Sequence, residues 1–160
     1  MKLFSLLILI LIFGCNTSEK KKDRITDNKN MESIDNFNDS IIEKKEGTTK
    51  LLMVNSASLK PSKEVLINGR DFSIVENEKK EIIYWSTNDK EFSTPEGYSV
   101  GMNWTEIPEE LKNKTGKMNG WGYFIRLNSG WQLGFCEGST CTDTYPNNLS
   151  VVKWIFKRKE

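Results

Sequence analysis

The stretch of residues 121–136, WGYFIRLNSGWQLGFC, restricts the fold more than any other part of the chain. Its apolar side chains alternate with glycine and polar residues at period two, which is the pattern of an antiparallel β-hairpin with one buried face. One face collects the large apolar side chains Trp121, Tyr123, Ile125, Leu127, Trp131, Leu133 and Phe135. Between the two halves, Gly130 can take the left-handed backbone conformation that a three-residue hairpin loop needs. We expect this hairpin to form the centre of the core.

The other strand patterns are short and are separated by turn residues. Apolar and β-branched runs predict strands at residues 51–54, 65–68, 72–75, 82–85 and 151–156. Pro61 is assigned to a loop, and Gly69 with Arg70 to a turn. Because both faces of the last run are largely apolar, we expect it to be an inner strand. The charged end that follows, residues 157–160, is expected to be solvated.

A helix pattern begins after Asn103, whose side chain suits an N-cap and could form a capping box with Glu106. Trp104 and Ile107 then share one helix face. Pro108 should bend the helix or delay its start, because proline has no amide hydrogen. Together these patterns predict an α+β fold, in which an antiparallel β-sheet, arranged as a meander, has one or two short helices packed on it.

The start of the chain has the pattern of a targeting segment. Lys2 precedes an apolar run, residues 3–13, which is shorter than the about 20 residues of a membrane-spanning helix and fits a signal peptide. The run ends in Ile-Phe-Gly-Cys, which resembles the lipobox of bacterial lipoproteins. The resemblance implies that residues 1–14 are a lipoprotein signal peptide and that Cys15 becomes the lipidated first residue. The alternative is an ordinary cleaved signal peptide with an unmodified Cys15.

Residues 15–49 are polar and carry charges of both signs, which predicts a tether. Within them, residues 30–45 have apolar positions at helical spacing, so we expect either a short amphipathic helix docked on the domain or only a nascent helix. The α+β globular domain is assigned to residues 50–160. A lipid on Cys15 would hold this domain at a cell-envelope membrane, on its periplasmic face or at the cell surface.

The composition excludes several kinds of site. The chain has no histidine, which excludes Ser-His-Asp and Cys-His catalysis and metal sites that use imidazole. The 23 lysine and arginine residues nearly balance the 22 acidic residues, so the overall charge does not indicate nucleic-acid binding. We therefore expect no cofactor, no metal and no nucleic-acid partner.

Cys136 and Cys141 are the two cysteines outside the targeting segment. Export would place them in an oxidising compartment, so we expect a structural disulfide that fixes the end of the central hairpin. A redox-active pair and a thiolate metal site are the alternatives. The spacing is not the Cys-x-x-Cys of disulfide oxidoreductases, and two cysteines without histidine make a poor metal site.

Residues 98–103, Tyr-Ser-Val-Gly-Met-Asn, are followed by Glu106 and Ile107 and then by predicted strands. This order resembles the small lipoprotein of the outer-membrane β-barrel assembly machine and the repeat of the β-lactamase inhibitor protein. In the resemblance, Gly101 is the turn and Asn103 the cap. These folds serve binding and scaffolding, so the resemblance implies no catalytic residue. An unrelated turn that enters a helix is the alternative.

Three functions remain compatible with the sequence. The first is a non-catalytic binding or scaffold domain in the cell envelope, with an envelope protein or peptide as its partner. The second is a secreted inhibitor or immunity-type protein with one tight partner. The third is a histidine-free hydrolase whose carboxylates would be Glu109 with Glu110, or Glu137 with Asp143. We expect the first, and therefore no enzyme, because adjacent acids on a helix point apart.

Mass spectrometry of the protein isolated from membranes tests the assignment of Cys15. We expect a chain that begins at Cys15 and carries the added mass of acyl groups. The Cys15→Ser chain should lose both the acyl mass and the membrane association, because the lipid is the expected anchor. Retention of residues 1–14, or a free thiol on Cys15, would contradict the assignment.

Overall fold

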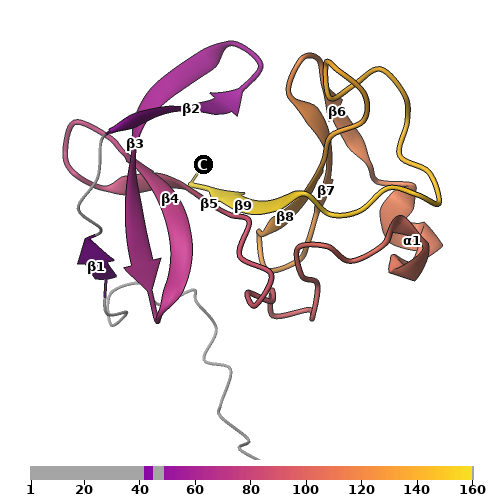
Figure 1. The fold of residues 1–160 in the computed structure, drawn as a ribbon, viewed down its shortest axis with the longest axis horizontal. Coiled ribbons are helices and arrows are strands. Elements are labelled where there is room, and N and C mark those ends of the chain that lie inside the picture. Colours follow the sequence, from indigo (N-terminus) through magenta and orange to yellow (C-terminus); the bar gives the residue numbers. More distant parts are fainter. Residues whose placement is uncertain (1–41, 45–48, 160) are drawn as a thin grey trace, which may run out of the picture. The chain divides into compact units, whose positions relative to one another are not determined.

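The computed structural model of the protein describes residues 42–44 and 49–159. These residues form mostly antiparallel β-sheet (Figure 1). The strands are β1 (Ile42–Lys44), β2 (Lys50–Asn55), β3 (Ser58–Ile67), β4 (Arg70–Glu76), β5 (Ile82–Thr87), β6 (Gly116–Met118), β7 (Gly122–Arg126), β8 (Gln132–Phe135) and β9 (Trp154–Arg158). The sheet is open, with the order β1-β3-β4-β5-β9-β8-β7-β6, and β2 pairs with β3 beside this path. The predicted antiparallel sheet is confirmed.

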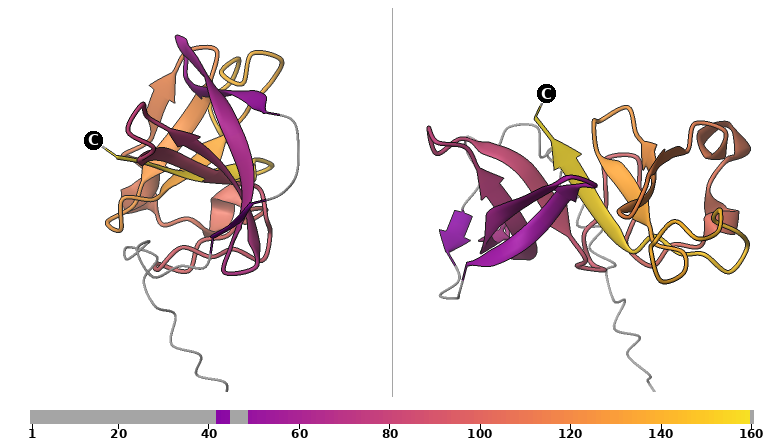
Figure 2. Two further views of the ribbon diagram at one scale, coloured as in Figure 1. Left: turned by 90° about the vertical axis from the view of Figure 1, so that its left-hand side faces the viewer. Right: turned by 90° about the horizontal axis from the view of Figure 1, so that it is seen from above.

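The last strand, β9, lies at the centre of the sheet. It pairs antiparallel with β5 on one side and with β8 on the other. The meander β3-β4-β5 and the meander β6-β7-β8 are therefore joined through the C-terminal end of the chain (Figure 2). An inner position was expected for this strand, although its residues begin later than the pattern predicts, at Trp154.

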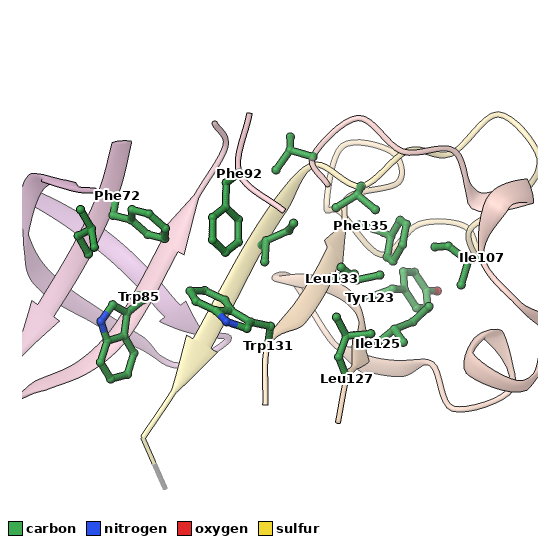
Figure 3. Packing of buried hydrophobic residues seen from close by; sticks show 14 of the residues in the cluster. Phe72, Trp85, Phe92, Ile107, Tyr123, Ile125, Leu127, Trp131, Leu133 and Phe135 are labelled. Atoms are coloured by element: carbon green, nitrogen blue, oxygen red, sulfur yellow. The ribbon is translucent and has the colours of Figure 1, made fainter. Parts of the chain in front are cut away.

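The central hairpin forms as the alternation predicts. Tyr123 faces Phe135 and Ile125 faces Leu133 across β7 and β8, and Gly130 has a φ of 83° in the connecting turn. Trp131 is fully buried. Its ring centroid lies 4.9 Å from that of Phe92, and Figure 3 shows how it joins this hairpin to aromatic residues of the first meander.

Trp121 departs from the predicted pattern. It precedes β7, and Gly122, the first residue of that strand, has a φ of 149°. The chain turns there, so that Trp121 packs on the opposite face of the sheet from Tyr123, with its ring centroid 4.8 Å from that of Phe156. Its indole nitrogen donates a hydrogen bond to the carbonyl oxygen of Met53, at 2.9 Å.

Two further predictions are wrong in the described residues. Pro61 lies within β3 and not in a loop, where it faces Leu51. Proline has no amide hydrogen to donate to a neighbouring strand. It is tolerated at position 61 because β3 pairs with β4 only from Lys63 onwards. Residues 42–44 form strand β1 and not helix, and they extend the sheet before the predicted boundary at residue 50. Residues 30–41 and 45 lie outside the described residues.

The helical part is smaller than the sequence predicts. A 3₁₀ turn, η1 (Trp104–Glu106), is followed by the short helix α1 (Glu109–Lys112). Pro108 stands between them as the N-cap of α1, which confirms that it delays the helix. The carboxylate of Glu106 accepts a hydrogen bond from the backbone amide of Asn103, at 2.7 Å, as a capping box requires.

Both faces of the sheet carry a packed cluster. The larger cluster contains Trp131 and the apolar face of the β7–β8 hairpin (Figure 3). On the other face Val75, Tyr84, Trp121 and Phe156 form a second cluster. The β2–β3 hairpin contributes Leu52 and Val54 to this second cluster, and it is here that the sheet carries its candidate site.

Glycines make room for Trp154 on this second face. A Cβ atom added at Gly134 of β8 would overlap the Trp154 indole, and one added at Gly122 of β7 would lie 2.8 Å from Cη2 of the same ring. The glycines that alternate with large residues along the hairpin therefore leave space for the indole of Trp154 to pack against the sheet. Trp154 in turn packs at 5.2 Å, centroid to centroid, against Trp121.

Replacing Gly134 with alanine tests this packing. We expect Gly134→Ala to lower the free energy of unfolding by about 1–3 kcal/mol, because the added methyl group displaces the indole of Trp154. In a Trp154→Leu background the same replacement should cost much less. Chemical denaturation of the four chains measures the coupling between the two positions. An equal cost in both backgrounds would show that Trp154 does not set the requirement for glycine.

Candidate functional site

A pocket of about 340 Å³ opens on the face of the second cluster. Phe124 and Arg126 of β7, Gln132 of β8, Arg158 of β9 and Lys159 line it. Period-two alternation places Phe124 and Arg126 on one side of β7. The register then puts Arg126 opposite Gln132, and Gln132 opposite Phe156, which alternates with Arg158 along β9. Three adjacent strands therefore supply one continuous wall.

Arg158 is the most unusual residue of this pocket. Its guanidinium carbon lies 5.0 Å from the ring centroid of Trp121, 5.1 Å from that of Phe156 and 5.9 Å from that of Tyr84. Cations are attracted to the faces of aromatic rings, so these rings hold the guanidinium in place. The Nε and Nη2 atoms are buried and have no hydrogen-bond partner among the described residues.

Among the described residues, the groups that influence the charge of Arg158 are one further cation, Arg126, and one phenol, Tyr84. Burial lowers the pKa of the Arg158 guanidinium from its usual value, Tyr84 opposes this shift, and Arg126 adds to it. An arginine nevertheless stays protonated in a protein. Burial also raises the pKa of Tyr84, so the phenol is neutral and supplies no balancing charge.

The chemistry of the lining favours an anion. Arg126, Arg158 and Lys159 bring three cations to the pocket, and the described residues that line it include no carboxylate. A guanidinium presents a planar fork of donors that matches the oxygens of a carboxylate or a phosphate. The pocket volume lies at the lower end of the range for small-molecule sites. A small anionic group with an apolar part would fit the combination of these cations with the ring of Phe124.

The sequence predicted a solvated end for residues 157–160, and Arg158 departs from that prediction. The available signal was the alternation that places Phe156 and Arg158 on the same face of one strand. Arg126 likewise alternates with Phe124 on the face of the hairpin turned away from the larger cluster. What the sequence could not supply was the insertion of β9 beside β8, which brings these residues together.

The cysteine assignments lie in different parts of the chain. Cys15 is outside the described residues. Cys136 and Cys141 are at disulfide distance, with their Cα atoms 3.9 Å apart, directly after β8. The loop between them is fixed by hydrogen bonds from the backbone amide of Glu137 to the carbonyl of Cys141, and from Ser139 to the carboxylate of Asp143. The pair therefore closes a tight turn at one end of the central hairpin.

Glu109, Glu110 and Asp143, three of the four carboxylates considered for catalysis, are engaged in local contacts, whereas Oε1 of Glu137 is buried without a hydrogen-bond partner among the described residues. Glu109 pairs with Lys112 and Glu110 with Lys114, each at 2.8 Å. The hydrogen bond from Lys114 lowers the pKa of Glu110. The hydroxyl of Thr140 and nearby backbone amides lower the pKa of Asp143. A general acid near neutral pH needs a raised pKa, so these shifts have the wrong direction for that role.

Comparisons with protein-family models, with curated proteins and with solved structures found no match for this chain. Within residues 42–44 and 49–159, no group of three or more cysteine, aspartate or glutamate residues is arranged to hold a metal ion. The same part of the chain contains no helix that is long and apolar enough to cross a membrane. The function must therefore be argued from the pocket and from the sequence.

Replacing both cysteines tests the role of the pair in the loop. We expect Cys136→Ser with Cys141→Ser to lower the free energy of unfolding by about 2 kcal/mol, the value that chain entropy gives for so short a loop. Chemical denaturation measures this loss. In the unmodified protein, neither thiol should react with an alkylating agent until a reductant is added. Ready alkylation without reductant would rule out the disulfide.

Proposed function

We propose that this protein is a non-catalytic binding domain, held at a bacterial envelope membrane by a lipid on Cys15, whose pocket binds a small anionic group. The observation that carries the proposal is the guanidinium of Arg158. It lies against three aromatic rings, two of its nitrogen atoms lack partners among the described residues, and it forms part of a pocket lined by further cations.

The physical argument for a ligand is that a desolvated cation gains most from an anion. Hydrogen bonds between a guanidinium and a carboxylate or phosphate are stronger than those between neutral groups. Partial burial increases the strength of the attraction between the charges. The Tyr84 phenol stays neutral, so it gives Arg158 no negative charge. An incoming anion would supply one.

The alternative that the guanidinium has a purely structural role predicts a different behaviour. In that case the rings of Trp121, Phe156 and Tyr84 would satisfy Arg158 by themselves, and added anions would bind no better here than elsewhere on the surface. Binding is favoured because Gln132 and Lys159 add polar groups at the same opening. A site with several convergent polar groups on an apolar wall has the features of a ligand pocket.

Binding and not catalysis is proposed because the site offers recognition groups but no proton-transfer group. The lining residues Arg126, Gln132, Arg158 and Lys159 donate hydrogen bonds or charge. Glu109 and Glu110 pair with lysines, Asp143 accepts from a backbone amide, and neither these carboxylates nor Glu137 line the pocket.

Titration with inorganic phosphate and with succinate, followed by NMR of the backbone and arginine side chains, tests the proposal. We expect saturable shifts centred on Gln132 and Arg158. Arg158→Lys keeps a positive charge but removes the fork, and should weaken binding by at least about tenfold. Comparing phosphate with succinate distinguishes the two anion types. The matched control is Arg70→Gln. It removes the arginine of β4 that pairs with Glu91 and does not line the pocket, so binding should be unchanged.

Two outcomes would contradict the proposal. One is the absence of saturable shifts with either anion at millimolar concentration. The other is an equal loss of binding in Arg158→Lys and Arg70→Gln, since that would indicate general attraction to a positive surface. Thermal unfolding of each variant shows whether it retains the fold, so that a loss of binding can be separated from a loss of structure.

A further inference from the structure

The pocket has an aromatic ring in its lining, and that ring lies beside a glycine. Among the described residues that line the pocket, Phe124 is the one aromatic residue. The register of β6 and β7 places Gly116 directly opposite Phe124. Residues that face each other across an antiparallel pair point to the same side of the sheet. The space that a side chain at position 116 would fill is therefore open to the Phe124 ring.

The ring of Phe124 occupies that space. A Cβ atom added at Gly116 would lie 2.5 Å from Cζ of Phe124, and 2.8 Å and 3.0 Å from its two Cε atoms. An atom in the plane of the ring and equally close to Cζ would be much farther from both Cε atoms, so the added atom lies over one face of the ring. The φ angle of Gly116 is not positive. Glycine is therefore needed here for the ring and not for the course of the backbone.

The opposite face of the ring is turned to the pocket. Gly116 belongs to β6, which lies on one side of β7, whereas Arg158 of β9 lies on the other side. The face of Phe124 that is turned away from Gly116 is therefore directed toward the cations of the lining. Trp121 and Phe156 meet the Phe124 ring in T-shaped contacts, at centroid distances of 6.3 Å and 6.4 Å. A ligand in the pocket thus meets the face of a ring that its neighbours hold in place.

The cations of the pocket stand close to this ring. Arg126 follows Phe124 by two positions on the same strand and lines the same pocket. At a rise of about 3.4 Å per residue, the Cα atoms of these two residues are about 7 Å apart. The pocket volume of about 340 Å³ is also small for a ligand site. A ligand that touches both the ring and a guanidinium is therefore compact.

An aromatic ring in the ligand uses these surroundings better than an aliphatic one. Aromatic pairs in offset or edge-to-face contact are more stable than the burial of their area alone explains. The faces of an aromatic ring also attract cations, which Arg126, Arg158 and Lys159 supply. A saturated ring of similar size would gain the burial but neither of the other two contributions.

We infer that the pocket binds a compact aromatic acid, which is a single aromatic ring that carries a carboxylate or a phosphate. The ligand ring packs on Phe124, and Arg126 and Arg158 bind the acid group. The inference rests on the proposed anion site and narrows its ligand. Gly116 is then a positioning residue, because a methyl group at this position would displace the Phe124 ring from β6 toward the pocket.

A ligand series on the unmodified protein tests the inference. Benzoate, cyclohexanecarboxylate and acetate share the carboxylate and differ in the ring. We expect NMR titration to give benzoate at least about tenfold higher affinity than acetate, and several-fold higher affinity than cyclohexanecarboxylate. Phenyl phosphate should likewise bind more tightly than inorganic phosphate. Comparing phenyl phosphate with benzoate shows which acid group the site prefers.

Variants of the ring and of its glycine test the residues that carry the inference. Phe124→Leu should bring benzoate and cyclohexanecarboxylate to the same affinity. Gly116→Ala should weaken the binding of benzoate about tenfold, and should have no further effect in the Phe124→Leu chain, which has no ring to displace. Tyr145→Leu is the matched control, because it removes a ring that is 52% exposed and does not line the pocket. This control should keep the preference for benzoate.

The outcomes separate this inference from the proposed function. Equal affinity for benzoate, cyclohexanecarboxylate and acetate would overturn the inference and leave the anion site standing. No saturable binding of any acid, inorganic phosphate included, would contradict both. A preference for benzoate that survives in Phe124→Leu, or that is lost equally in Tyr145→Leu, would also overturn the inference. Thermal unfolding shows which variants retain the fold, and the ligand series on the unmodified protein does not depend on them.

Discussion

The pairing of β9 with both β5 and β8 is the interaction on which the rest of the structure depends. Each meander is a set of local hairpins, and only β9 joins the two sets into one sheet. The strand brings Ile155 to the larger cluster and Phe156 to the second cluster. Because β9 pairs on both sides, its position requires both meanders to be in place beside it.

The same insertion creates the candidate site. Arg158 follows Phe156 at period two, so the face of β9 that completes the second cluster also carries a guanidinium. Trp121, Phe156 and Tyr84 come from three distant segments and meet around it. The aromatic rings hold the cation but supply no negative charge, and burial lowers its pKa. An anion is the proposed ligand because Arg158 is held rigidly and two of its nitrogen atoms have no partner among the described residues.

Local patterns predicted much of the sheet, and they failed where distant contacts decide. The β7–β8 hairpin follows from alternation and from Gly130, and the N-cap at Asn103 follows from side-chain chemistry. Trp121 was assigned to the wrong face, because nothing nearby reveals that Gly122 turns the chain. Pro61 suggests a loop until it is known that one side of β3 is unpaired there.

The candidate site could be predicted least of all. Arg158 sits in a charged C-terminal tail, which in isolation indicates exposure, and its burial depends on strands that are far away in the sequence. The exposed face of the β2–β3 hairpin could not be predicted either, because an apolar run predicts a strand but does not tell which of its faces the core covers. The lipidation of Cys15 stays a prediction from the sequence alone, because Cys15 lies outside the described residues.

The measurement that tests the central claim most directly is the nitrogen–proton NMR correlation of the Arg158 side chain. The account predicts that ring currents from Trp121 and Phe156 shift the Nε–H signal far from that of a solvated arginine. It also predicts slow exchange of that proton with water, and movement of the signal when inorganic phosphate is added. An Arg158 signal at the position of a free arginine, exchanging rapidly and unaffected by phosphate, would contradict the account.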